Sequence, residues 1–264
     1  MEDIGAMTSL KPVKYLETLS GKAAHLLLFA DGNRYAVKCK NNFHGTRELV
    51  NEFVIARLGQ LLSLPVVPFE IVHMSKEQIQ YIPKNFSSNY KPGKQFASLF
   101  IDNCIGLSKK PPHPTKNEIK NHQVLAGIFV FDHWVHNADR TKSNILLERL
   151  PEGKYNIHMI DHGKCFSGGY KWNEATLQKR KGFKKDSIVH IWAAGMLEDL
   201  TIVSSYIEQI LALPEVSIEE VIREIPEDWD VPLQDREALI TYLKEQKKTF
   251  ADSVYKFIKK YGNA

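Results

Sequence analysis

The chain has 264 residues, with 35 Lys and Arg against 31 Asp and Glu, so its formal net charge is +4. Hydrophobic residues make up 43% and charged residues 25%, with 15 Gly and 12 Pro. This composition is globular, and it excludes collagen-like, low-complexity and disordered chains. The mild positive charge permits an anionic ligand but does not indicate a general nucleic-acid binder, so nucleic acid is not an expected partner.

The cysteines at positions 39, 104 and 165 are odd in number and lack a CxxC spacing, so neither a disulfide framework nor a zinc ribbon is predicted. Residues 1–17 lack the basic start and apolar run of a signal peptide. No apolar stretch reaches the roughly 18 residues that a membrane span needs, so no transmembrane segment is predicted. These features predict a cytoplasmic protein.

The first third of the chain is predicted to be mainly β-strand. Apolar runs at 26–30 and 34–38 flank an Asp-Gly pair at 31–32, which favours a tight hairpin because Gly accepts a positive φ. Apolar residues then recur at helical spacing over 45–63, which predicts a helix. The next run, 66–74, favours another strand.

Residues 81–117 are rich in Pro and are predicted to be a connector between lobes, with one strand inside it. Thr115 and Glu118 fit a capping box, which predicts a helix that starts there and is buried by 125–131, where it is apolar nearly all round. The remaining predicted elements are strands at 145–147 and 157–160, long helices at 186–212 and 235–260, and a short helix capped by Ser217.

This order of elements predicts a two-lobed α+β fold rather than an alternating βαβ fold. The small, mainly β N-lobe is expected at about residues 1–102. The mainly helical C-lobe is expected at about residues 103–264, and the two lobes together are expected to form a single domain.

The strongest chemical signal lies between residues 136 and 163. Asp139 is followed five residues later by Asn144, then by two predicted strands and by Asp161-His162-Gly163. This order is typical of the catalytic and metal loops of kinases. Phosphoryl transfer needs a carboxylate that orients the attacking hydroxyl and accepts its proton, a role that Asp139 fits. It also needs oxygen ligands for Mg²⁺, which Asn144 and Asp161 can supply.

A cation for the nucleotide phosphates is predicted at Lys38. The run Tyr35-Ala36-Val37-Lys38 has the apolar-Ala-apolar-Lys form of the kinase strand lysine. A Glu on the following helix should hold this lysine, and Glu52 is the predicted partner. Glu48, one helical turn earlier, is the close alternative, and the sequence does not separate the two.

The loop before the first hairpin strand is the candidate cover for the phosphates. It contains a single Gly, so it matches neither GxGxxG nor the Walker motif. Its Ser20-Gly21-Lys22 turn can direct backbone N–H groups and a hydroxyl at phosphates, which makes Ser20 and Gly21 candidate nucleotide-binding residues. The alternative is an ordinary glycine turn.

These motifs resemble those of the HipA-like kinases in their short bacterial form, which are related to the phosphatidylinositol 3- and 4-kinases. The Asp-Arg-x-x-x-Asn form at 139–144, followed by Ile-Asp-x-Gly, is similar to the lipid-kinase signature. Asn137-x-Asp139 is similar to the catalytic loop of HipA. The stretches 49–52 and 225–229 add to the resemblance, which spans roughly residues 18–235.

The resemblance implies a bilobal protein-kinase-like fold that binds ATP and Mg²⁺ and phosphorylates a Ser or Thr hydroxyl of a protein, including its own. Some HipA-like proteins are toxins paired with DNA-binding antitoxins, so a toxin-like role and an antitoxin-like partner are candidates. The chain departs from the pattern in three ways. Its 264 residues leave no room for the extra N-terminal subdomain of full-length HipA. Thr141 stands where lipid kinases carry His, and His162 stands where many kinases carry Phe.

Other functions remain open at this point. One is a lipid or small-molecule kinase that acts on an anionic lipid or head group. Another is a catalytically inactive, kinase-shaped binding module, which the missing Gly-rich loop favours. A metal hydrolase built on the histidines at 133, 136, 158 and 162 is a more distant alternative. The basic run 179–185 follows the Asp-x-Gly and can hold an acidic protein or a phosphorylated head group, unless it is simply a solvated loop.

Overall fold

The structure is a computed structural model that describes residues 10–107, 112–179, 187–197 and 199–262. The chain divides into two compact units. The first unit comprises residues 1–49 and 68–100, and the second comprises residues 50–67 and 101–264. Within the described ranges, no helix combines the length and apolar character needed to cross a bilayer.

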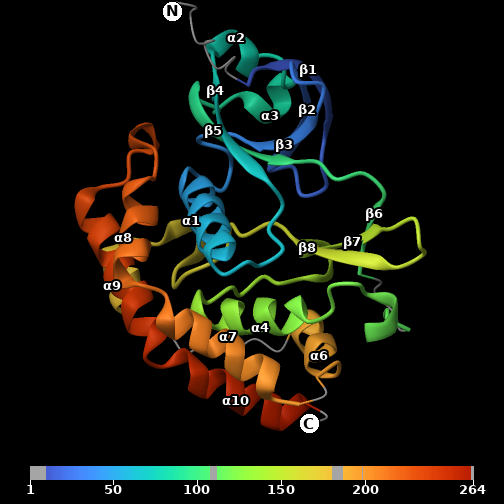
Figure 1. Ribbon diagram of the computed structural model, residues 1–264. Coiled ribbons are helices and arrows are strands. Elements are labelled where there is room, and N and C mark those ends of the chain that lie inside the picture. Colours follow the sequence, from blue (N-terminus) through green and yellow to red (C-terminus); the bar gives the residue numbers. More distant parts are fainter. Residues whose placement is uncertain (1–9, 108–111, 180–186, 198, 263–264) are drawn as a thin grey trace, which may run out of the picture. The chain divides into compact units, whose positions relative to one another are not determined.

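The first unit is built on an antiparallel sheet in the order β1-β2-β3-β5-β4 (Figure 1). The strands are β1 (Pro12–Thr18), β2 (Ala24–Phe29), β3 (Arg34–Lys38), β4 (Phe69–Met74) and β5 (Gly93–Leu99). Two short helices, α2 (Lys76–Ile79) and α3 (Lys84–Ser87), connect β4 to β5. Buried side chains from these strands and from α2, among them Leu27, Val37, Met74 and Ile79, form one apolar cluster. The sheet therefore buries one face against its own connections.

The predicted hairpin at residues 26–38 is confirmed. Gly32 adopts a φ of +83°, which an L side chain rarely takes, and Asp31 accepts a hydrogen bond from the Asn33 backbone. The strand predicted from residue 66 begins only at Phe69, because Pro68 lacks a backbone N–H to donate to a neighbouring strand. The connector, predicted to hold one strand, holds two: β5 and the short strand Cys104–Gly106.

The second unit joins a small sheet to a set of helices. Helix α1 (Arg47–Leu61) starts in the first unit and continues into the second. The sheet of the second unit has the strand order β6 (Cys104–Gly106), β7 (Ile145–Arg149) and β8 (Tyr155–Met159). The other helices are α4 (Val124–Trp134), α5 (Glu174–Gln178), α6 (Ile188–Ala194), α7 (Thr201–Ala212), α8 (Glu215–Arg223), α9 (Leu233–Lys247) and α10 (Phe250–Tyr261). Single 3-10 turns lie at Lys116–Glu118, Lys142–Asn144, Gly169–Lys171 and Glu227–Trp229. The helix predicted at 45–63 and the strand pair at 145–160 are confirmed.

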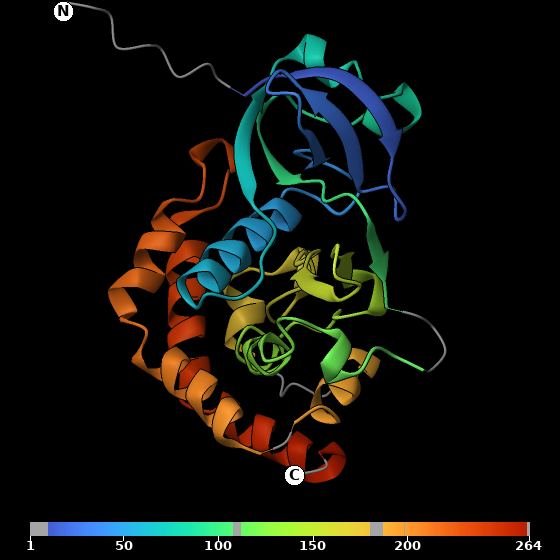
Figure 2. The same cartoon turned by 45° about the vertical axis from the view of Figure 1, so that its right-hand side comes forward.

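Helix α4 is the centre of the second unit, with α7 and α10 packed along it (Figures 1 and 2). Its side chains are buried from Leu125 to Trp134, as the apolar run predicts. A Cβ at Gly127 would lie 2.6 Å from the Tyr206 ring of α7, so glycine permits this close approach. A hydrophobic helix covered on all sides can thus carry an ionisable side chain that water does not reach.

Several predicted helix boundaries are wrong. The capping box of Thr115 and Glu118 is present, but it encloses only a 3-10 turn, and α4 starts at Val124. The long helix predicted at 186–212 is divided into α6 and α7, since α6 ends at Gly195, a residue that favours helix ends. The helix predicted at 235–260 is also two, α9 and α10, and Thr249 between them has a non-helical φ of −131°.

Ser217 was predicted to cap a helix, but it lies inside one. Helix α8 begins at Glu215, directly after Pro214. Proline fixes φ near the helical value and has no N–H to leave unpaired, so a chain enters a helix readily at that point. The pattern Ser-x-x-Glu was therefore a coincidence of spacing rather than a cap.

Candidate active site

In the first unit, Lys38 ends β3 as a nearly buried cation. Its Nζ donates a hydrogen bond to Glu48 Oε1 at 2.9 Å. Glu48 lies in the first turn of α1 and also accepts from Asn42 Nδ2 at 2.8 Å, while His44 Nδ1 lies 3.2 Å from its Oε2. Burial opposes ionisation of Glu48, but the Lys38 charge and the hydrogen bonds from His44 and Lys38 outweigh it and lower the pKa of Glu48 below its ordinary value.

The structure thus gives Lys38 the partner that the sequence named as the alternative to Glu52. Glu48 and Glu52 are four residues apart on one helix, and such residues lie on the same face. Glu52 belongs to the second unit, where its Oε2 accepts a hydrogen bond from the backbone N–H of His162 at 3.0 Å. Each glutamate therefore has a hydrogen-bond partner of its own: Lys38 for Glu48 and the His162 backbone for Glu52.

Ser20 and Gly21 lie in the turn that joins β1 to β2. The turn is closed by a bond from Lys22 N to Leu19 O at 3.0 Å, and Gly21 has a φ of +91°. Ala24, where β2 begins, pairs directly with Lys38 on β3. The exposed Ser20-Gly21 turn and Lys38 consequently sit at the same end of the sheet.

In the second unit, the loop after α4 brings Asp139 and Asn144 together. Asp139 is partly exposed, and its backbone carbonyl accepts from Asn144 Nδ2 and from Thr141 N, both at 2.7 Å. Its backbone N–H donates to Asn137 Oδ1 at 3.0 Å. Lys164 Nζ lies 3.2 Å from Asp139 Oδ2. The loop is held by its own side chains, with the Asp139 carboxylate at its partly exposed tip.

Asp161 follows β8 and has a left-handed backbone, with a φ of 57°. The two peptide groups beside it are both held by side chains. Arg140 Nη1 donates to the carbonyl of Ile160 at 3.1 Å, and Glu52 accepts from the N–H of His162. Ile160 N also donates to the carbonyl of Asn144 at 3.2 Å. A strained residue held from both sides is typical of a functional site.

Asn51, next to Glu52 on α1, fixes the chain beyond Asp161. Its Nδ2 donates to the carbonyls of Gly163 at 2.6 Å and Gly169 at 3.2 Å, and its Oδ1 accepts from Trp172 Nε1 at 2.6 Å. The segment 49–52 is part of the family resemblance noted in the sequence, but that resemblance did not predict this role for Asn51.

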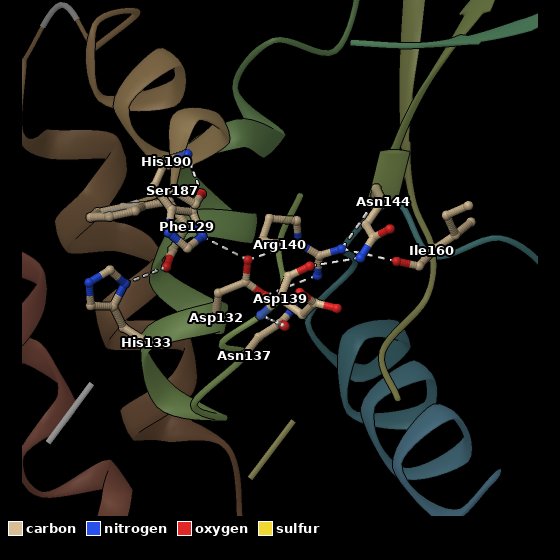
Figure 3. Close-up of polar contacts among 10 residues, drawn as sticks. All are labelled: Phe129, Asp132, His133, Asn137, Asp139, Arg140, Asn144, Ile160, Ser187 and His190. Atoms are coloured by element: carbon tan, nitrogen blue, oxygen red, sulfur yellow. Dashed lines mark hydrogen bonds and ion pairs between the residues drawn. The ribbon is translucent and has the colours of Figure 1, made fainter. Parts of the chain in front are cut away.

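A buried polar cluster that the sequence did not predict surrounds the carboxylate of Asp132 inside α4 (Figure 3). The carboxylate accepts from Arg140 Nε and Nη2 at 2.9 and 3.0 Å, from Asn137 Nδ2 at 2.9 Å and from His190 Nε2 at 2.9 Å. Burial opposes its ionisation, but the Arg140 charge and the bonds from His190 and Arg140 hold the pKa of Asp132 well below its ordinary value. A lone acidic residue in an apolar helix was the available signal, because buried charges are paired.

Two of the histidines considered for a metal cluster have separate partners. His133 Nδ1 lies 2.9 Å from the carbonyl of Phe129, within α4. His158 Nε2 lies 2.8 Å from Glu148 Oε2, across the β7–β8 pair. The basic run 179–185, which the sequence left open as a substrate contact or a solvated loop, lies outside the described residues except for Lys179.

A pocket of about 590 Å³ lies beside the loop that carries Asp139, in the second unit. Its wall comprises Gly106, Leu107, Arg140, Thr141, Lys142, Ser143, Ser187 and Ile188. Four of these, residues 140–143, follow Asp139 directly along the chain, so a molecule in this pocket lies next to the loop that carries that carboxylate.

The sequence profile of the HipA-like kinase family matches residues 22–255. The chain belongs to the HipA-like kinase family. Its reaction class is therefore phosphotransfer of the kinase type. No curated protein matches the chain in sequence.

Solved structures that resemble this chain have low sequence identity to it. The proinflammatory kinase CtkA of Helicobacter pylori matches with a TM-score of 0.58 and 15% identity, over 96% of both chains. The Golgi casein kinase with Mn and ADP bound matches with a TM-score of 0.54 and 11% identity, over 91% of this chain and 73% of that one. HipA of Shewanella oneidensis MR-1, solved with HipB and operator DNA, matches with a TM-score of 0.39 and 13% identity, over 98% and 70%. The first two confirm the protein-kinase-like α+β fold, with a β-rich N-terminal part and a helical C-terminal part.

The second unit offers a donor set that fits a hard divalent cation. Asp161 supplies a carboxylate on a firmly held backbone. Asn144 commits its side-chain nitrogen to the Asp139 carbonyl, so its side-chain oxygen is the atom that it offers to a ligand. Mg²⁺ prefers one or two such protein oxygens and keeps the rest of its shell for water and phosphate.

Proposed function

We propose that the chain transfers the γ-phosphate of ATP, in the presence of Mg²⁺, to a Ser or Thr hydroxyl of a protein. The observation that carries this proposal is the arrangement of Asp139, Asn144 and Asp161 in the second unit, with both peptides beside Asp161 held by Arg140 and Glu52. Catalysis of phosphoryl transfer requires carboxylate and amide groups held in fixed positions. The similarity in fold to the kinase CtkA and to a casein kinase with Mn and ADP bound supports it.

The proposed roles follow the chemistry of each group. Asp139 orients the acceptor hydroxyl and accepts its proton as the oxygen bonds to the γ-phosphorus and the bond from that phosphorus to the β-phosphate oxygen breaks, releasing ADP. Asn144 and Asp161 hold Mg²⁺, which neutralises charge on the phosphates when bound. Lys38 contributes a cation to the phosphates, and the turn at Ser20 and Gly21 contributes backbone N–H groups.

The proposal includes the wider expectations from the sequence. The two units act as the lobes of one kinase domain, and the protein works in the cytoplasm. The pocket beside residues 141–143 is where a protein acceptor would approach Asp139. An antitoxin-like partner remains a candidate for binding and is not needed for the transfer itself.

The test of this function is transfer of label from γ-labelled ATP. Purified chain with Mg²⁺ is expected to label itself or casein, and not vesicles that contain anionic phosphoinositides. Asp139→Asn is expected to lower the rate by about 10²- to 10⁴-fold, the usual contribution of a general base, while ATP still binds. Asp252→Asn, the same change at an exposed position on α10, serves as the control.

Labelled vesicles would instead identify a lipid kinase. ATP binding without transfer to any acceptor would favour an inactive, kinase-shaped binding module. Undiminished transfer by Asp139→Asn would contradict the assignment of Asp139 while leaving the reaction class in place.

The partner of Lys38 can be tested by the same substitution at two positions one helical turn apart. Glu48→Gln removes the charge that Lys38 contacts, so we expect the Kd for ATP to rise by about 10-fold, since a hydrogen bond to a charged group contributes roughly 1.5–3 kcal/mol. Glu52→Gln keeps an oxygen that can accept from His162 N, so we expect a smaller rise. Calorimetric titration with ATP and Mg²⁺ measures both. A larger rise in the Kd for ATP with Glu52→Gln than with Glu48→Gln would show that Glu52 matters more for ATP binding.

A further inference from the structure

Helix α6 is tied to the catalytic loop by a buried histidine. Ser187 caps the helix, and its Oγ accepts from the backbone N–H of His190 at 3.1 Å, which fixes His190 in the first turn. The His190 side chain is fully buried, and its ring packs edge-on against Phe129 and Phe257. From this position Nε2 lies 2.9 Å from Asp132 Oδ2 (Figure 3).

The direction of this hydrogen bond follows from the charge of its partner. The depressed pKa of Asp132 keeps its carboxylate ionised, and an ionised carboxylate can only accept hydrogen bonds. His190 must therefore carry a hydrogen on Nε2 and donate it. The ring cannot be replaced by an apolar side chain without removing one of the donors to Asp132.

Asp132 passes this constraint to the residues proposed to hold the cation. Its two oxygens accept hydrogen bonds from Nε and Nη2 of Arg140, and this pair of bonds fixes the plane of the guanidinium. The remaining Nη1 of Arg140 then donates to the carbonyls of Asn144 and Ile160, both at 3.1 Å. Asn144 is one proposed ligand, and Ile160 immediately precedes the other, Asp161.

We propose that His190 is a positioning residue for phosphotransfer, which acts through Asp132 and Arg140 to hold the backbone at Asn144 and before Asp161. This inference rests on the proposed phosphotransfer function. It also connects α6 to the reaction, because Ser187 and Ile188 at the start of that helix line the pocket beside the catalytic loop. A partner that displaces α6 would loosen the loop through His190.

The test compares two substitutions of His190 with one of His133. His190→Leu removes the donor at similar volume, and His190→Gln keeps an N–H that can reach Asp132. His133→Leu is the matched control. Like His190, His133 is buried and hydrogen-bonded, but it lies on α4 and bonds to the Phe129 carbonyl. All three variants are first checked for cooperative thermal unfolding.

We expect His190→Leu to lower kcat by about 10- to 100-fold, the usual effect of losing a group that orients a metal ligand. The KM for ATP should stay within about twofold, because the groups that touch ATP are intact. His190→Gln should recover most of the rate, and His133→Leu should keep it. A folded His190→Leu with unchanged kcat, or a His190→Gln as slow as His190→Leu, would overturn the inference.

A second measurement does not depend on activity. Amide hydrogen exchange of peptides that cover residues 140–163 should be faster in His190→Leu than in His133→Leu. Equal exchange in the two variants would refute the positioning role. If the wild-type chain transfers no phosphate, the proposed function fails on its own, and the exchange result still decides whether His190 holds the loop.

Discussion

Asp161→Asn is expected to reduce phosphate transfer by about 10³-fold or more, the scale of losing a principal charge-stabilising group. The substitution removes the negative charge proposed to bind the cation and keeps the shape of the side chain. The choice of asparagine matters because Asp161 has a φ of 57°, a conformation that Asn adopts more readily than Ala. The bonds from Arg140 and Glu52 are made to the backbone on either side, so they survive the change.

Asp230→Asn is the matched control for this prediction. Asp230 is exposed and also has a left-handed backbone, with a φ of 52° at the end of a 3-10 turn. Transfer of label and urea denaturation are measured on both variants. Asp230→Asn should resemble the wild type in both, whereas Asp161→Asn should lose transfer and stay folded. Full activity in Asp161→Asn would remove Asp161 from the site.

Arg140→Met is expected to cost about 3–5 kcal/mol of the free energy of unfolding, the usual effect of leaving one member of a buried ion pair unpaired. The side chains of Arg140 and Asp132 are both fully buried. Methionine fills much of the space but leaves the Asp132 carboxylate without its cation, and the carbonyls of Asn144 and Ile160 without their donor. Urea denaturation followed by circular dichroism measures the loss.

Two further variants establish that the cause is the uncompensated charge. The double variant Asp132→Asn with Arg140→Met should be more stable than Arg140→Met alone, because both charges are then gone. Arg57→Met breaks the Arg57–Glu224 pair, whose side chains are 40% and 48% exposed, and should cost less than about 1 kcal/mol. A double variant no more stable than Arg140→Met would show that packing, rather than charge, sets the loss.

Local sequence signals predicted the elements that depend on neighbouring residues. The Asp-Gly turn, the helix after residue 45 and the β7–β8 pair each carry their information within a few positions. In the order Asp139, Asn144, Asp161, Asn144 hydrogen-bonds to the Asp139 carbonyl and to Ile160, the residue before Asp161. Helix ends were predicted less well, because Gly195 and Thr249 interrupt patterns that are periodic on both sides of them.

The rest of the site depends on residues that are distant in the sequence. Asp132 and His190 are 58 positions apart, and no local pattern pairs them. Glu48 and Glu52 present the opposite difficulty, because two equivalent residues share a helix face and only their contacts distinguish them. In both cases the contacts depend on tertiary packing, which the spacing of residues in the sequence does not determine.

The four hydrogen bonds on the Asp132 carboxylate also bear on how this sequence can change over generations. Loss of Asp132 leaves the buried charge of Arg140 unpaired, and loss of Arg140 leaves the buried charge of Asp132 without its cation. A single substitution at either position is therefore strongly disfavoured. His190 and Asn137 donate to the same carboxylate and become unpaired if it is lost. Among descendants of this chain, positions 132, 137, 140 and 190 should therefore change together or not at all.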